Sequence, residues 1–146
     1  METGYLKISN IEGGQPTIEA QLINNTLWLT VNEIAQLFDV YVNTIGNNLR
    51  SIFKSGLLYE ENVSFTHRYT DKKGGEWQTV LYNLDAIIFV SYRIASPNAA
   101  IFRQWINDSF REHLKKNDIQ NNSKLFWTFQ SGKSYSLSRI KLDKIP

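Results

Sequence analysis

The stretch VNEIAQLFDVYVNTIGNNLR, residues 31–50, decides the fold because it predicts two short helices packed across a tight turn. Numbered from one, it fits the twenty-position pattern of helix-turn-helix repressors. Ala35 stands at the fifth position, where only a small side chain lets the helices cross closely, so we expect it to be buried there. Asp39 stands at the ninth position, where glycine is usual because the turn needs a left-handed backbone. Aspartate tolerates that conformation better than most residues.

Capping and spacing signals set the bounds of the two helices. Thr30 or Asn32 can cap the first helix, and the second runs from about residue 42 to residue 54, with Gly56 as an end signal. Apolar residues recur at helical spacing and are expected to face inward: Ile34, Phe38, Val40, Ile45 and Leu49. The same pattern also occurs as a plain packing unit with no role in DNA binding, and that alternative stays open.

The outward side of the second helix carries the candidate DNA contacts. In helix-turn-helix proteins the N-terminal part of this helix enters the major groove, where side chains meet base edges. Asparagine can bond adenine through two hydrogen bonds, valine can touch a thymine methyl group, and basic side chains suit phosphates. The predicted contacts to bases are Tyr41, Val42, Asn43, Thr44, Asn47 and Asn48, and the predicted phosphate contacts on this helix are Arg50 and Lys54.

A two-stranded hairpin is predicted directly after the helix pair, over residues 62–83. Alternating residues predict one strand over 63–70 and a second over 77–82, with the loop 71–75 between them. A hairpin in this position is the arrangement of a winged helix, whose wing meets phosphate with positive charge. The predicted wing contacts are Arg68, Lys72 and Lys73. The plainer interpretation is a solvated turn, because lysine and glycine are common there.

The rest of the chain completes a prediction of the α+β class: a winged helix-turn-helix-like domain with an N-terminal β-hairpin and two C-terminal helices. Partial alternation over residues 5–8 and 17–22 predicts the N-terminal hairpin, and Ser96-Pro97 is a clear start signal for the last helix. The expected ranges are 1–118 for the domain, 31–54 for the helix-turn-helix, 62–83 for the wing, 84–95 and 97–116 for the helices, and 119–146 for a short aromatic, basic extension with a turn at Ser131-Gly132-Lys133.

Motifs outside the helix pair stand in a recognisable order: Trp28-Leu29-Thr30, Tyr82-Asn83-Leu84-Asp85-Ala86-Ile87-Ile88, Tyr92-Arg93, Ser96 and Phe102-Arg103-Gln104-Trp105. Together with the helix-turn-helix they resemble the RhuM virulence family of bacterial and phage-associated proteins. The resemblance implies an intracellular protein of DNA-binding type and no proven catalytic activity. The chain departs from the family at Asn47 and Asn48, where an arginine and a histidine are usual, and at Ser91, where a glycine is usual.

Composition excludes several classes of protein. The 146 residues are 42% apolar and 21% charged, with a formal net charge of +2, which excludes a disordered chain. The chain has no cysteine, and its start shows no basic region followed by an apolar run, so we expect a soluble cytoplasmic protein without a membrane span. His67 and His113 stand in no metal-ligand spacing, and no acid–base pair stands out. We expect no enzyme activity, cofactor, metal or small-molecule ligand.

Charge is distributed unevenly along the chain. Residues 67–146 hold thirteen basic and seven acidic side chains, whereas residues 1–66 hold three basic and seven acidic ones. A basic half can mark a surface that binds polyanions, although ordinary scatter gives such differences too. Asp85 is expected to pair with Arg93 or Arg103, because a charge at a partly buried motif position normally has a partner.

The expected function is therefore regulatory binding of double-stranded DNA. We also expect a homodimer, because one recognition helix reads few base pairs and the segment 125–129 is too apolar to remain in solvent. The alternative is a protein-interaction module of a defence or toxin-type system, which would use the aromatic tail and the basic helix without specific DNA binding. Steep salt dependence of duplex binding would favour the first function.

Overall fold

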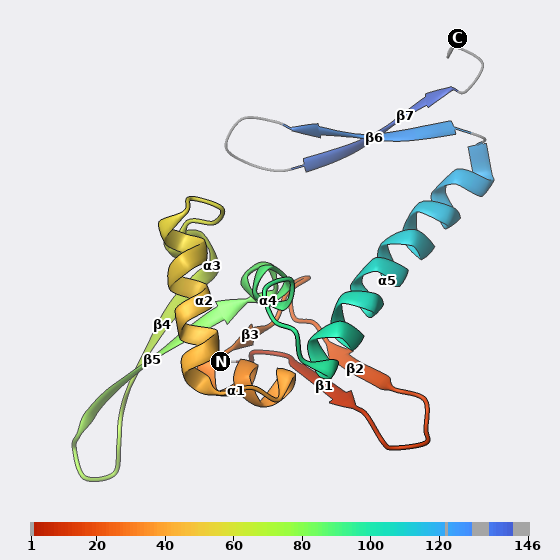
Figure 1. Cartoon of the computed structure of the whole chain (residues 1–146). Coiled ribbons are helices and arrows are strands. Elements are labelled where there is room, and N and C mark those ends of the chain that lie inside the picture. Colours follow the sequence, from red (N-terminus) through yellow and green to blue (C-terminus); the bar gives the residue numbers. More distant parts are fainter. Residues whose placement is uncertain (1, 122, 130–134, 142–146) are drawn as a thin grey trace. The chain divides into compact units, whose positions relative to one another are not determined.

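The computed structural model describes the backbone of residues 2–121, 123–129 and 135–141, and the side chains of residues 2–116. The chain divides into two compact units, Met1–Trp105 and Ile106–Pro146, so the division falls inside the last long helix. The elements follow in this order (Figure 1): β1 (Tyr5–Ser9), β2 (Thr17–Gln21), β3 (Trp28–Leu29), α1 (Val31–Phe38), α2 (Val42–Lys54), α3 (Glu60–Val63), β4 (Ser64–Thr70), β5 (Glu76–Asn83), α4 (Leu84–Ser91), α5 (Pro97–Asn121), β6 (Ser123–Phe129) and β7 (Tyr135–Lys141).

The mixture of helices and antiparallel strands confirms the α+β class. β1 pairs with β2, and β6 pairs with β7, each as a two-stranded sheet. β5 lies between β3 and β4 in a three-stranded sheet. The two hairpins in the first unit lie where the alternation predicts them. Within the described residues, no helix is both long and apolar enough to cross a membrane.

Local chemistry at both ends sets the length of α1. The Oγ1 of Thr30 accepts a hydrogen bond from the backbone N–H of Glu33 at 3.1 Å, and the Glu33 carboxylate accepts one from the N–H of Thr30 at 3.0 Å. At the other end Asp39 takes the predicted left-handed conformation, with φ of 55°. The next N–H, of Val40, reaches back to the carbonyl of Ala35 at 3.0 Å, which closes the helix and starts the turn toward α2.

The core of the first unit lies where α1, α2, α4 and the start of α5 meet. Ala35 is only 3% exposed, which confirms the expected burial of this small side chain on α1. The rings of Phe38 and Phe102 pack at 5.4 Å between centroids, joining α1 to α5. Ile45 of α2 and Ile87 of α4 are fully buried, and burying each such side chain stabilises the fold by about 1.5–3 kcal/mol.

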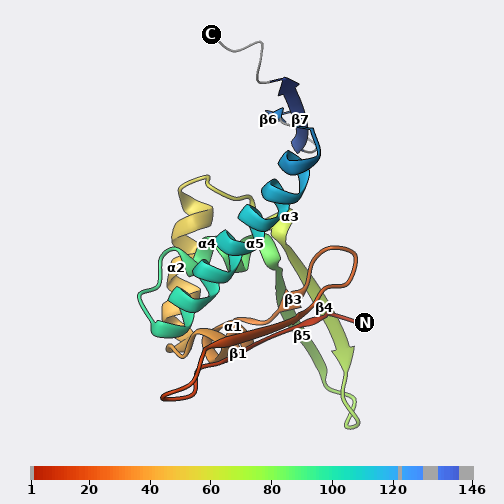
Figure 2. The same ribbon diagram turned by 90° about the vertical axis from the view of Figure 1, so that its right-hand side faces the viewer.

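The β4–β5 hairpin is anchored at its base and free at its tip. Trp28 and Leu29 of β3 pair with the end of β5, while the ring of Tyr82 on β5 stacks on Phe53 of α2 with centroids 6.2 Å apart. Figures 1 and 2 both show the closed end of the hairpin projecting away from α1, α2 and α4. This arrangement places the hairpin beside α2, with its loop in solvent.

Several predicted bounds differ from the structure. α4 ends at Ser91 rather than at 95, because the N–H groups of Tyr92 and Arg93 bond carbonyls three residues back and close a tighter turn. α5 continues to Asn121 rather than ending at 116. Residues 62 and 63 belong to the short helix α3, so the hairpin begins at Ser64. The predicted extension 119–146 starts inside α5 and contains β6 and β7, and its predicted turn at residues 131–133 lies outside the described residues.

Candidate functional site

The exposed start of α2 carries the first group of candidate contacts. Tyr41, which precedes the helix, is 85% exposed, and Val42 and Asn43 are exposed as well. They face outward because the apolar residues Ile45 and Leu49 occupy the buried side of the helix. The side chain of Tyr41 makes no capping hydrogen bond to the start of α2, and the first turn of α2 contains no acidic residue. The helix dipole at this end therefore favours an anion, with no nearby carboxylate on the same turn.

The two adjacent asparagines of α2 are bonded within the protein. The carboxamide oxygen of Asn47 accepts a hydrogen bond from the guanidinium of Arg50, one turn further along. Asn48 donates from Nδ2 to the carbonyl of Thr44 at 2.8 Å and accepts at Oδ1 from Nε of Arg93 at 3.2 Å. Both amides therefore hold arginines, which the sequence pattern did not predict.

Arg93 contacts α2 instead of forming the expected ion pair with Asp85. It lies in the turn two residues after the end of α4, and its guanidinium donates from Nη2 to the hydroxyl of Ser51 at 2.9 Å in addition to its bond to Asn48. The side chain thus reaches across to α2 and remains exposed. Periodicity could not reveal this contact, because it joins a residue of α2 to a turn residue more than forty positions further along the chain.

The expected ion pair between Asp85 and Arg93 or Arg103 is wrong. Arg103 donates from Nη1 to the backbone carbonyls of Ser91 and Ile94, at 2.5 and 2.6 Å. These bonds give hydrogen-bond partners to a carbonyl at the end of α4 and to one in the segment after it. Asp85 is exposed in the first turn of α4, where the helix dipole stabilises a carboxylate without a cationic partner. The arginines therefore bond neutral acceptors instead.

The remaining cations near α2 and on the hairpin are exposed and unneutralised. On α5, Arg111 lies 3.7 Å from a carboxylate oxygen of Asp108. The predicted phosphate contacts are all exposed: Arg50, Lys54, Arg68, Lys72 and Lys73. None of them is paired with a carboxylate of the described side chains, so their charge is available to an external anion.

The loop of the hairpin is held by the carboxylate of Asp71. One oxygen accepts hydrogen bonds from the N–H groups of Lys73 and Gly75, at 2.9 and 2.7 Å, and the other accepts from the indole Nε1 of Trp77 at 2.7 Å. These hydrogen bonds lower the pKa of Asp71 below its ordinary value of 3.8. The bond from Trp77 has the largest effect on the pKa, and the bond from Gly75 has the next largest. The loop that carries Lys72 and Lys73 is thus an ordered turn.

Gly75 leaves room for the Asp71 carboxylate in this turn. A Cβ at this position would lie 2.8 Å from Oδ2 of Asp71, so a larger residue here would displace that carboxylate from its present position. The sequence pattern predicts Asp71 only as a loop residue and Trp77 only as a strand residue. The signal that could have found them is an aspartate whose side chain caps a tight turn a few residues before a glycine.

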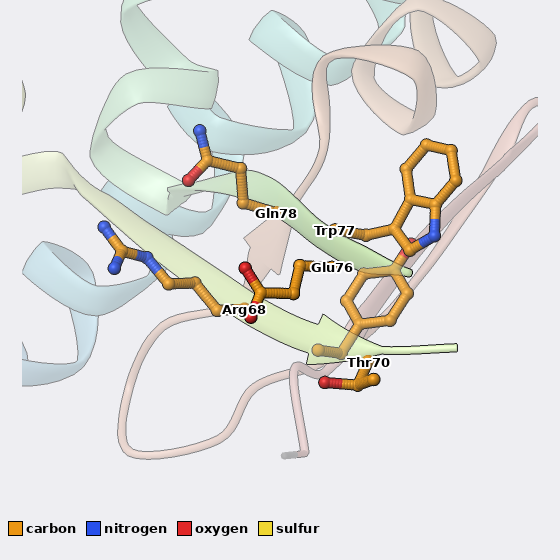
Figure 3. A pocket seen from close by; sticks show the side chains of 6 residues that line it. Arg68, Thr70, Glu76, Trp77 and Gln78 are labelled. Atoms are coloured by element: carbon orange, nitrogen blue, oxygen red, sulfur yellow. The ribbon is translucent and has the colours of Figure 1, made fainter. Parts of the chain in front are cut away.

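The two faces of the hairpin differ in chemistry. Arg68 pairs with Gln78 and Thr70 with Glu76 across the strands, so these polar residues share one face. Tyr82 belongs to the same face by register, and it packs on α2, so Arg68 projects from the side of the hairpin that faces α2. Figure 3 shows the six residues that line an open hollow here, with Arg68, Thr70, Glu76 and Gln78 from this face, Tyr69 and Trp77 from the other, and the Trp77 indole turned away from Arg68.

The opposite face of the hairpin is aromatic. Phe65, Tyr69 and Trp77 are 45%, 46% and 56% exposed, and the rings of His67 and Tyr69 are stacked with centroids 5.8 Å apart. Tyr69 lies directly across from Trp77 in the strand register. Exposed aromatic rows of this kind mark contact surfaces more often than scattered single residues do.

The structure brings the predicted residues of α2 onto one helix, where Thr44 and Asn48 are half-buried and the others are exposed. It places Arg68 on the α2 side of the hairpin, while Lys72 and Lys73 lie in the loop at its tip. Asn47 and Asn48 are engaged with arginines, whereas Asn43 makes no side-chain hydrogen bond to the described residues. No cluster of three or more acidic or histidine side chains suited to a metal is found where side chains are described.

One comparison with known proteins finds a match. The model of the virulence protein RhuM family matches residues 61–141, more than half of the chain, from the second residue of α3 through β7. This match confirms the family that the separated sequence motifs resemble. The helix pair α1–α2 lies outside the matched range. No curated protein and no solved structure matches the chain.

Proposed function

This chain belongs to the virulence protein RhuM family, and from its exposed basic side chains we propose that it binds double-stranded DNA in a regulatory role, without catalysis. In this proposal α1 and α2 act as a helix-turn-helix, α2 enters the major groove, and the β4–β5 hairpin is the wing. Binding of this kind needs positive charge and a helix that fits the groove, and it needs no catalytic group.

One observation carries the proposal: the exposed side of α2 and the adjoining face of the hairpin both present cations that are not paired with any carboxylate among residues 2–116. Arg50 and Lys54 project from α2, and Arg68 projects from the hairpin face that Tyr82 joins to α2. Lys72 and Lys73 extend the same charge to the tip. A duplex carries one phosphate charge about every 1.7 Å along its axis, which an array of this kind can neutralise.

The roles divide along α2. Its exposed N-terminal residues would meet base edges, with Asn43 free to bond adenine and Val42 beside a thymine methyl group. Tyr41 and Thr44 flank them at the same end of the helix. Arg50 and Lys54, in the second half of α2, would contact phosphates and fix the register of the helix in the groove.

The test is a salt titration of the full chain against random-sequence duplex, followed by selection of preferred sites. We expect the logarithm of the binding constant to fall linearly with the logarithm of salt, with a slope of about −0.9 for each phosphate contacted. Selection should return an enriched sequence that random duplex does not match in affinity. Absence of duplex binding at low salt would refute the proposal.

We also propose that the protein binds DNA as a homodimer. β6 and β7 pair only with each other in the described part of the chain, so each strand has one unpaired edge. Unpaired edges accept strands from a second copy. Sedimentation should show a dimer that becomes a monomer when the residues after Ser123 are removed, and a full chain that stays monomeric at high concentration would contradict this.

A second candidate function is a protein-interaction module of a defence or toxin-type system. The observation that favours it is the exposed aromatic row of Phe65, Tyr69 and Trp77, on the hairpin face opposite Arg68. Such a surface suits a protein partner, since aromatic residues are enriched in interface cores. A stoichiometric protein complex that persists equally in low and high salt, with no duplex binding, would favour this function over the first.

A further inference from the structure

We propose that Arg93 is a phosphate contact of the DNA-binding face, and that Asn48 positions it rather than reading a base. The inference rests on the proposed function and extends it to a residue outside the helix pair. It also changes the role expected of Asn48, from a base contact to a side chain that acts through an arginine. Asn47 and Arg50 repeat the arrangement one position earlier on α2.

The geometry around Arg93 fixes its guanidinium beside α2. Its backbone N–H bonds the carbonyl of Val90 at 2.9 Å, which holds the residue at the end of α4. Nε donates to Oδ1 of Asn48 at 3.2 Å, and Nη2 donates to the hydroxyl of Ser51 at 2.9 Å. A guanidinium has five N–H donors in a planar fork, so three remain for an external acceptor. The side chain is exposed, and those donors are accessible.

Both partners of Arg93 orient it without neutralising it. An amide oxygen and a hydroxyl accept hydrogen bonds but carry no net charge, whereas a carboxylate would offset the positive charge of the guanidinium. Among the described side chains, Arg93 and Arg50 make no ion pair, in contrast to Arg111, which lies 3.7 Å from Asp108. An oriented, uncompensated guanidinium is suited to a phosphate, which it can bind through two parallel hydrogen bonds.

The bonds of Asn48 leave it unable to read a base. Recognition of adenine by asparagine uses both the oxygen and the nitrogen of the carboxamide. Here Oδ1 is bonded to Arg93 and Nδ2 donates to the carbonyl of Thr44 at 2.8 Å, and the side chain is half-buried. A base would have to break both bonds at once. The amide is therefore placed to hold Arg93, and sequence preference is left to the start of α2.

The experiment is a salt titration of duplex binding with four variants of the full chain: Arg93→Ala, Asn48→Ala, the double variant, and Arg111→Ala as the matched control. The control removes the same charge from an exposed arginine of α5. Arg93→Ala should lower the salt slope by about one and weaken binding on the order of tenfold at 0.1 M salt, on preferred and random duplex alike. Asn48→Ala should weaken binding in the same sequence-independent way and by less.

The double variant separates positioning from base contact. If Asn48 acts through Arg93, Asn48→Ala causes no further loss of affinity once Arg93 is alanine. A further loss confined to the preferred site in that background would overturn the inference, because it would show that Asn48 reads a base. An Arg93→Ala slope equal to that of Arg111→Ala would overturn it as well.

Arg93 links α2 to the end of α4, so Arg93→Ala could unfold the protein. In that case Arg93→Lys provides the test. Lysine keeps the charge but lacks the planar fork, so the salt slope should persist while affinity falls several-fold. An affinity equal to that of the unmodified protein would overturn the claim that the oriented fork matters. If the unmodified protein binds no duplex at low salt, the proposed function itself fails. If it binds and only Arg93 and Asn48 are without effect, the inference alone fails.

Discussion

The indole Nε1 of Trp77 donates a hydrogen bond to the carboxylate of Asp71 at 2.7 Å, which ties the start of β5 to the loop before it. The same carboxylate bonds two backbone N–H groups of the loop, so one side chain fixes the segment that carries Lys72 and Lys73. An ordered loop loses less conformational entropy when it contacts a ligand. Order at the tip therefore supports the role of the hairpin as a wing.

Replacing Asp71 with alanine should loosen this loop while leaving the rest of the hairpin paired. The N–H groups of Lys73 and Gly75 lose their acceptor, so their hydrogen exchange should become faster. Asp85→Ala removes an exposed aspartate in the first turn of α4 and serves as the control. Unchanged exchange at Lys73 and Gly75 in Asp71→Ala would show that the carboxylate does not order the loop.

The loop should respond to acid and not to alkali. The pKa of Asp71 is lowered in the folded protein by its bonds to Trp77 and Gly75, so these bonds stabilise the loop fully above the ordinary value of 3.8. They are lost as the pH falls through the lower folded pKa. An NMR titration should show the Trp77 indole proton unchanged from pH 7 to about pH 5 and shifted in stronger acid. A transition near neutral pH would contradict the assignment.

Leucine at position 35 should destabilise the first unit by about 1–3 kcal/mol, because the larger side chain overpacks the contact between α1 and the core. Thermal and denaturant midpoints measure the change. Ala100→Leu places the same substitution at an exposed position of α5 and should leave the midpoints nearly unchanged. Equal midpoints for Ala35→Leu and the unmodified protein would show that the helices do not cross closely at this residue.

The lysine pair at the tip should contribute to affinity without contributing to sequence preference. Lys72→Ala with Lys73→Ala should weaken binding to preferred and random duplex nearly equally. The salt slope should fall by about two, because each of the two lysines neutralises one phosphate. Lys115→Ala with Lys116→Ala removes the same charge from exposed positions of α5 and is the matched control. If the tip pair behaves like the control, the hairpin is not a wing.

Local chemistry was enough to predict many of the elements of the first unit. The left-handed Asp39 and the cap at Thr30 depend only on neighbouring residues, and both were predictable. The strands of the β4–β5 hairpin followed from alternation, apart from one to two residues at their ends. The predicted end of α4 was wrong, because this helix ends in a turn of backbone hydrogen bonds that a side-chain pattern does not predict.

The contacts of the candidate site depend on how helices pack, and sequence pattern does not fix packing. Arg93 bonds Asn48 and Ser51 because α4 ends beside α2, a relationship between segments far apart in the chain. Charge alone suggested a carboxylate partner, yet the fold supplies neutral acceptors. The candidate residues of α2 could therefore be named from sequence, while the division of labour among its asparagines could not.

That division leads to a contrast between Asn43 and Asn47. Asn43 is exposed near the start of α2 and makes no side-chain hydrogen bond to the described residues, whereas Asn47 holds Arg50. Asn43→Ala should cost about 1–3 kcal/mol on the preferred site and little on random duplex, because it removes a base contact.

Asn47→Ala should instead weaken binding to the preferred site and to random duplex by a similar factor. It should also lower the salt slope, because Arg50 loses the amide that orients it toward phosphate. Binding constants for both variants on the selected site and on random duplex, each over a range of salt, measure the contrast. Asn10→Ala, at an exposed position after β1, is the control and should match the unmodified protein. If Asn47→Ala reduces affinity only on the selected site, the amide reads a base and its bond to Arg50 gives way on binding.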